Sequence, residues 1–189
     1  NYVRDSIKAN RKYLKQIEQL YKNKGETPTS YRLARKKAFL ALGDLNAAFQ
    51  RMAQEPKSGE KELAQVFKLA SLNHEFLSSA ASLGTFIGSH STTAASEFFG
   101  RYMGSIQKNL KAGIDIMEQD TAEEKNRNEN LKEAEDYFED LYDKLVAERQ
   151  QEIREGKEQI SEELRSKMQE VQIITDQLKW LLELSETLK

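Results

Sequence analysis

Residues 27–52, TPTSYRLARKKAFLALGDLNAAFQRM, carry the pattern that decides the fold. Apolar side chains recur there at three- and four-residue steps, which is the period of one face of an α-helix. This face consists of Tyr31, Ala34, Ala38, Ala41, Leu42, Leu45, Ala48, Phe49 and Met52. We expect Thr27 to cap the helix and Pro28 to occupy its first position. Because Pro56 cannot continue a helix, the pattern predicts a long amphipathic helix over residues 28–54.

The same period continues on both sides of this stretch. It predicts further helices over residues 2–24, 60–87, 93–118, 122–155 and 162–188. Thr121 and Glu124 have the spacing of a capping box at the start of the fifth of the six helices. That helix is expected to bury Leu131, Ala134, Phe138, Leu141 and Leu145. The sequence therefore predicts an all-α fold, with residues 1–189 forming a single antiparallel bundle of about six long helices.

The composition agrees with this fold class. The chain of 189 residues contains 9 glycines and 2 prolines, too few to mark the turns of a many-stranded sandwich, barrel or Rossmann-like sheet. It contains 0 cysteines. Disulfides, thiolate zinc sites, iron–sulfur clusters and cysteine nucleophiles are thereby excluded, and a reducing compartment fits.

The longest uncharged run extends from Phe76 to Ser96. Although it has the length of a membrane span, its small residues and hydroxyls make it too polar for lipid. Neither does the beginning of the chain have the apolar core of a signal peptide, so we expect a soluble piece. Close packing in the middle of the bundle is the favoured role of this run, assisted by Gly100 and Gly104; a contact surface for another subunit or for a membrane portion is the alternative. Trp180 is expected to anchor the core or an interface.

The formal net charge of -2 conceals a strong segregation of charge. Residues 1–37 carry 11 Lys and Arg against 3 Asp and Glu, whereas residues 118–163 carry 7 against 17. The basic residues form a stripe at helical steps (Arg4, Lys8, Arg11, Lys12 and Lys15) and a second cluster (Arg32, Arg35, Lys36 and Lys37).

Three uses of these basic residues can be compared. Nucleic-acid binding is disfavoured by the pI of 5.9 and by the lack of interleaved aromatic residues. A position beside a membrane agrees better with the pattern, because Lys and Arg flank membrane helices on the cytoplasmic side and attract anionic inner-leaflet lipid. The remaining interpretation is a solvated stripe that pairs with the acidic helix over residues 122–155.

The sequence contains no recognisable catalytic motif. A di-iron bundle requires Glu-x-x-His, but Ser71 precedes His74 and Ile87 precedes His90 at that spacing. Neither a nucleophile elbow nor a phosphate-binding loop is present. The acid-rich residues 133–143 are expected to form a solvated helix face rather than a weak cation site. We therefore expect no enzyme activity, no cofactor and no metal.

Two stretches carry a family resemblance: YRLARKKAFLALGDLNAAFQRMAQEPKS (residues 31–58) and QEVQIITDQLKWLLELSETL (residues 169–188). They resemble the soluble C-terminal region of the fusaric-acid-resistance-like family, bacterial inner-membrane proteins regarded as aromatic-acid exporters. The resemblance spans most of the chain and transfers no functional residue. It implies a cytosolic domain at the inner membrane, whose partners are the membrane-spanning part of the same polypeptide and, in the full protein, further copies of itself.

These observations lead to one favoured function and two alternatives. The favoured function is a non-enzymatic cytosolic domain that assembles or gates the membrane part of an efflux protein, with its basic end facing lipid. The first alternative is a free-standing helical scaffold or adaptor for protein partners. The second is a bundle that senses a small ligand in a pocket formed by His74, His90 and Tyr102.

Overall fold

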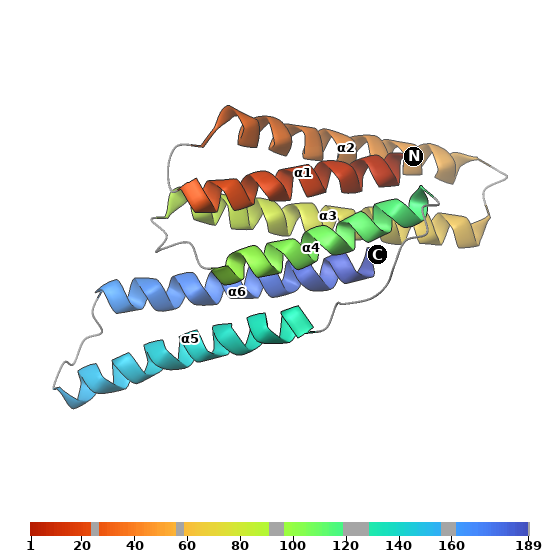
Figure 1. The fold of residues 1–189 in the computed structure, drawn as a ribbon. Coiled ribbons are helices and arrows are strands. Elements are labelled where there is room, and N and C mark those ends of the chain that lie inside the picture. The colour runs from red at the N-terminus through yellow and green to blue at the C-terminus, as the bar shows by residue number, and fades with distance from the viewer. Residues whose placement is uncertain (24–26, 56–58, 91–96, 119–128, 156–161, 189) are drawn as a thin grey trace.

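The computed structural model describes residues 1–23, 27–55, 59–90, 97–118, 129–155 and 162–188. Within these ranges the chain forms six helices and no strand: α1 (Tyr2–Asn23), α2 (Thr29–Gln54), α3 (Glu60–Ser89), α4 (Glu97–Met117), α5 (Glu129–Arg154) and α6 (Glu162–Thr187). Each helix runs in the direction opposite to the preceding one (Figure 1). The predicted all-α bundle is confirmed.

Four of the helices form a central bundle. The contacts run from α1 to α3, from α3 to α6, from α6 to α4 and from α4 back to α1, which closes a ring. Helix α2 packs only on α1 and α3, and helix α5 packs only on α4 and α6, among the described residues. The two flanking helices therefore lie on opposite sides of the ring (Figure 1).

The core of the ring is made by large side chains from all four central helices. The members that are completely or almost completely enclosed include Ile7, Tyr13, Leu14, Ile17, Phe76, Leu77, Leu83, Tyr102, Ile106, Leu110, Leu178 and Leu181. Burial of one such side chain contributes about 1.5–3 kcal/mol relative to its exposure, so the apolar stripes hold the helices together. Leu145 of α5 is buried as expected, and Leu141 is only half-buried. Leu131, Ala134 and Phe138 lie outside the described side chains.

The described helix ends match the predicted bounds to within two residues, except that the predicted starts at residues 93 and 122 lie outside the described residues, and there is one clear error. Pro28, rather than Thr27, is the N-cap residue of α2, and its carbonyl accepts hydrogen bonds from the backbone N–H groups of Tyr31 and Arg32 at 3.1 and 3.3 Å. Extended backbone at Pro28 explains the shift, because φ −69° with ψ 155° lies outside the helical region. The proposed capping box of residues 121–124 falls outside the described residues.

The first part of the uncharged run packs centrally, as predicted. Phe76, Leu77 and Leu83 of α3 are fully buried, and α3 contacts α1, α2 and α6. The close approach of helices occurs at Gly84, where a Cβ atom would lie 2.4 Å from the hydroxyl oxygen of Tyr31.

Two expectations about packing positions were wrong. A Cβ atom added at Gly100 or Gly104 would meet nothing within 4 Å among the described residues, so these glycines permit no close helix contact there. Trp180 is 44% exposed, so its expected role as an anchor of the core is wrong, while the alternative role as an interface anchor stays a prediction. It lies on the outer side of α6, where the neighbouring Leu181 and Leu182 take the buried positions instead.

A buried polar cluster joins α1 to α3. Asn73 Oδ1 accepts hydrogen bonds from Asn10 Nδ2 at 3.1 Å and Ser6 Oγ at 3.5 Å, and Asn73 Nδ2 donates to the carbonyl of Leu69 at 3.0 Å. Ser6, Asn10 and Asn73 are each no more than 1% exposed. Because buried polar groups need partners, this cluster fixes the lengthwise position of α1 against α3.

Candidate functional site

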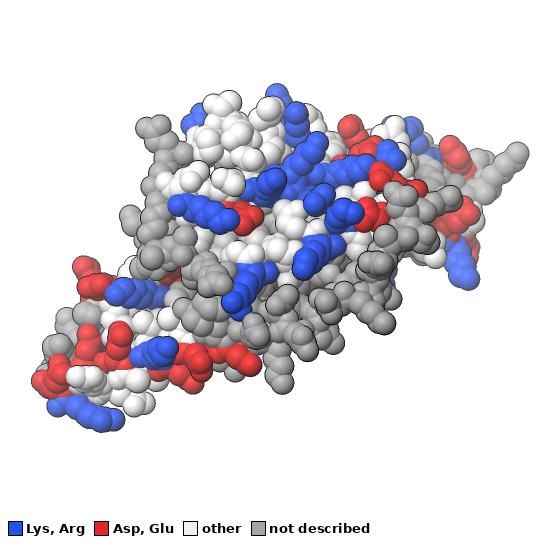
Figure 2. All heavy atoms as spheres, in the orientation of Figure 1, with Lys and Arg blue, Asp and Glu red and all other residues white. Residues whose placement is uncertain are grey.

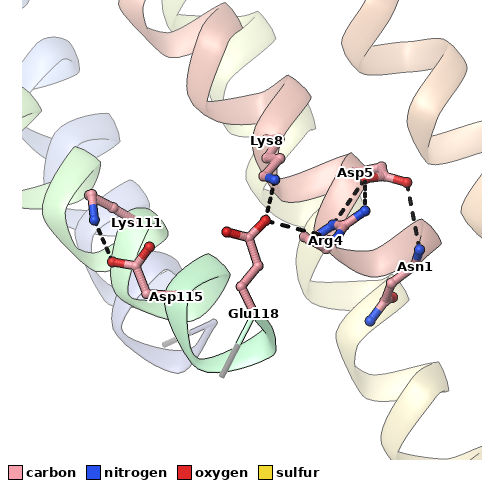
Figure 3. A network of polar contacts seen from close by, with 7 residues as sticks. All are labelled: Asn1, Arg4, Asp5, Lys8, Lys111, Asp115 and Glu118. Carbon is pink, nitrogen blue, oxygen red and sulfur yellow. Dashed lines mark hydrogen bonds and ion pairs between the residues drawn. The ribbon is translucent and has the colours of Figure 1, made fainter. Parts of the chain in front are cut away.

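The α1 basic stripe is the set of five cationic residues predicted from the sequence: Arg4, Lys8, Arg11, Lys12 and Lys15. Its first half contacts the carboxyl end of α4 (Figure 3). Arg4 and Lys8 both form ion pairs with Glu118, the Arg4 pair at 3.8 Å, and Arg4 also pairs with Asp5 at 3.2 Å. The side chains of Lys8 and Glu118 are 42% and 31% exposed. An ion pair so open to solvent contributes at most about 1 kcal/mol, so the contact orients α1 more than it stabilises the fold.

Arg11, in the middle of the stripe, is also committed to α4. Its Nε donates a hydrogen bond to Gln107 Oε1 at 2.9 Å, and Gln107 Nε2 donates to the Arg11 carbonyl at 3.0 Å. This reciprocal pair holds the guanidinium against α4, half-buried. The cations from Arg4 to Arg11 are thus partly occupied by packing within the bundle.

Lys12 and Lys15 differ from the rest of the stripe. Both are exposed, and neither forms an ion pair or a hydrogen bond with any residue that the structure describes. Lys108 of the adjacent α4 is likewise exposed and forms no ion pair or hydrogen bond with a described residue. Figure 2 shows Lys and Arg side chains spread over the face formed by α1 and α4, while Asp and Glu side chains gather along α5. This face presents cations whose charge is not neutralised by neighbouring side chains.

The acidic helix does not neutralise the basic stripe. Helix α5 contacts α4 and α6, and in the described part of the chain it makes no contact with α1. For the described residues 129–155, the interpretation that the acidic helix pairs with the stripe within one chain is therefore wrong, whereas residues 122–128 lie outside the described residues. Asp136, Asp140 and Asp143 are exposed on α5. Apart from Glu118, which pairs with Arg4 and Lys8, the described charges of the basic and acidic segments are therefore separated in space as well as in sequence.

The second basic cluster, Arg32, Arg35, Lys36 and Lys37, lies exposed on the outer side of α2. Three of these residues border a hollow of about 650 Å³, which we name the α2–α3 hollow. It is lined by Leu20, Thr27, Tyr31, Arg32, Arg35, Lys36, Phe39, Leu40, Gly84, Thr85, Gly88 and Ser89. Lys37 does not line it. The hollow combines cations, hydroxyl groups and apolar walls, and none of the described residues that line it is acidic.

Tyr31, which lines this hollow, is paired with Tyr13 of the core. The hydroxyl groups of Tyr13 and Tyr31 are hydrogen-bonded at 3.0 Å, and the rings lie 5.4 Å apart between centroids. Burial, followed by the hydrogen bond with Tyr31, raises the pKa of the Tyr13 phenol well above its ordinary value, and the charge of Arg35 acts in the opposite direction. The phenol therefore stays protonated at neutral pH.

The structure does not bring together His74, His90 and Tyr102. His74 is exposed on α3, whereas Tyr102 is fully enclosed in the core of α4. His90 follows the end of α3 with its ring stacked on Phe86 at 4.3 Å, and it lines a second hollow of about 430 Å³ against α6. Neither His74 nor Tyr102 lines either of the hollows described here. These three residues do not form a common pocket.

Two further observations concern the described residues alone. No three His, Asp or Glu side chains gather there as the ligands of a metal ion would. None of the helices in these ranges combines the length with the apolar content that crossing a lipid bilayer requires.

Sequence reasoning identified the cations but missed what surrounds them. It did not single out Gln107 and Glu118, which fix the stripe on α4, because the pairing of α1 with α4 is visible only in three dimensions. Phe39 and Leu40 were missed as walls of the hollow for the same reason. The available signal was their place on α2: neither residue belongs to the helix face that carries the core pattern, and both are exposed.

The chain was also compared with known proteins. No protein-family model, no curated protein and no solved structure matches it.

Proposed function

We propose that this chain is a non-enzymatic, membrane-proximal domain of a bacterial inner-membrane efflux protein, and that its α1 basic stripe faces anionic lipid. The observation that carries the proposal is the cationic face of α1 and α4, on which Lys12 and Lys15 are exposed and form no ion pair with described residues. Basic residues near an anionic leaflet each contribute about 1 kcal/mol of attraction. The acids of α5, which lipid would repel, gather along a helix that packs on α4 and α6 and, in the described residues, makes no contact with α1 (Figure 2).

The assignment to an efflux protein rests on the resemblance of residues 31–58 and 169–188. Residues 31–54 of the first stretch lie in α2, and residues 169–187 of the second lie in α6. Such a domain would assemble or gate the membrane part rather than transport anything itself.

Flotation with lipid vesicles tests the lipid-facing surface. We expect vesicles containing about one third anionic phospholipid to retain the protein at low salt, and neutral vesicles to release it. Lys12→Glu/Lys15→Glu should weaken retention at least about tenfold, because it removes two attractions and adds two repulsions. Retention should also fall at high salt, since exposed charges are screened.

The matched control is Lys61→Glu/Lys68→Glu, which changes the net charge equally at two exposed lysines of α3. This control should bind nearly as well as the original protein. Equal retention of both double variants, or binding of the original protein to neutral vesicles alone, would contradict the proposed surface.

The reading frame of the gene tests the assignment to a membrane protein. We expect it to encode several apolar segments of about 20 residues in the same polypeptide, because each membrane-spanning helix needs that length. Sequencing the locus provides the measurement. A reading frame without such segments would favour the free-standing scaffold instead.

A further inference from the structure

The α2–α3 hollow has the size and the lining of a small-molecule site. Its volume of about 650 Å³ lies within the range of roughly 300–1,000 Å³ that is typical of ligand pockets. Leu20, Phe39 and Leu40 supply apolar surface, and Phe39 and Leu40 remain 43% and 58% exposed. Covering such apolar surface with the apolar part of a ligand lowers the free energy, because the surface is removed from water.

The cations around the hollow indicate that a ligand would carry a negative charge beside its apolar part. Arg32, Arg35 and Lys36 line it together, and none of them forms an ion pair with a described residue. The guanidinium carbon of Arg35 lies 5.0 Å from the centroid of the Phe39 ring, which keeps this cation at the edge of the apolar wall. A guanidinium offers paired N–H donors that match a carboxylate.

The lining of the hollow also includes neutral hydroxyl groups. Tyr31 lines the hollow and is only 7% exposed, while its hydroxyl is tied to that of Tyr13. Thr85 and Ser89 line the opposite wall, which belongs to α3. Among the described residues of the lining, no negative charge opposes an anion.

We propose that the α2–α3 hollow binds an organic acid with an apolar body, whose carboxylate pairs with Arg32, Arg35 and Lys36 and whose body covers Phe39, Leu40 and Leu20. We expect the carboxylate to belong to a free small molecule rather than to a lipid, because the apolar walls and the cations line one concavity of limited volume. This site is distinct from the α1 basic stripe, so it does not depend on the proposed lipid-facing function.

Calorimetric titration of the whole chain with octanoate tests the proposal. We expect saturable binding of octanoate, and binding at least about tenfold weaker for acetate, which lacks the body, and for octanol, which lacks the charge. Arg32→Gln/Arg35→Gln should weaken octanoate binding at least about tenfold, and Phe39→Ala severalfold.

Lys37→Gln is the matched control, because Lys37 belongs to the same cluster but does not line the hollow; it should bind octanoate normally. Circular dichroism confirms that each variant stays folded, which is expected because all four residues are exposed.

The same variants separate a free carboxylate from a lipid. Vesicle retention should be nearly unchanged in Arg32→Gln/Arg35→Gln, and octanoate binding should be unchanged in Lys12→Glu/Lys15→Glu. The proposal is overturned if octanoate fails to saturate, if Lys37→Gln weakens octanoate binding as much as the double variant does, or if the double variant loses vesicle retention instead of octanoate binding. Loss of vesicle retention in Lys12→Glu/Lys15→Glu alone concerns only the proposed function.

Discussion

Replacing Asn73 by alanine should lower the free energy of unfolding by about 3 kcal/mol. The substitution removes the acceptor shared by Ser6 and Asn10, which then remain buried without this partner. Each unsatisfied buried polar group costs about 1–3 kcal/mol, and the missing side chain leaves a cavity between α1 and α3 as well. Denaturant unfolding followed by circular dichroism measures the change. The effect is a large fraction of the roughly 5–15 kcal/mol by which a domain is stable.

Two controls identify the buried hydrogen bonds as the cause. Asn46→Ala, at an exposed position of α2, should change the free energy of unfolding by less than about 0.5 kcal/mol. The triple variant Ser6→Ala/Asn10→Leu/Asn73→Leu removes all the partners together and should recover most of the lost stability. If Asn73→Ala costs no more than Asn46→Ala, the cluster does not fix α1 against α3.

The sequence predicts the helices well because each carries a long amphipathic pattern of its own. The faces of residues 2–24 and 28–54 appear as the buried sides of α1 and α2. In α3 the helical period fits either Asn73 or His74 at the inner position; Asn73 takes it, and His74 is exposed. A single polar residue can occupy a core position when a neighbouring helix supplies its partners, and periodicity alone does not contain that information.

The arrangement of the helices could not be predicted from charge. The basic and acidic segments of the sequence suggested that α1 and α5 meet, but the described parts of α5 pack on α4 and α6. Charges at the surface attract one another weakly in water and salt, whereas the apolar faces contribute far more free energy. The faces therefore decide which helices are neighbours. The hollow could not be predicted either, because its cations come from α2 while part of its wall comes from α1 and α3, and the sequence does not show which helices are neighbours.

Gly84→Ala is expected to lower the free energy of unfolding by about 2 kcal/mol. The new methyl group would lie 2.4 Å from the Tyr31 hydroxyl, 3.2 Å from the Tyr13 hydroxyl and 3.3 Å from Ile17 Cγ1. Tyr31 is the nearest of these neighbours, and its rigid ring can yield only by straining or breaking the hydrogen bond with Tyr13. Gly104→Ala is the matched control, because its methyl group would meet nothing within 4 Å among the described residues. Since alanine favours a helix over glycine, this control should raise the stability by about 0.5–1 kcal/mol.

A double-mutant cycle with Tyr31→Phe assigns the cost of Gly84→Ala to the hydroxyl contact. Removing that oxygen relieves the closest approach, so Gly84→Ala should cost at least about 1 kcal/mol less in the Tyr31→Phe protein than in the original. Tyr31→Phe alone should cost about 1 kcal/mol, because it deprives the buried Tyr13 hydroxyl of its partner. An unchanged cost in the two backgrounds would show that the α1 side chains Tyr13 and Ile17, rather than the Tyr31 hydroxyl, require a glycine there. Gly84 would then serve helix packing alone. A strong coupling between Gly84→Ala and Tyr31→Phe would instead link Gly84 to Tyr31, which also lines the α2–α3 hollow.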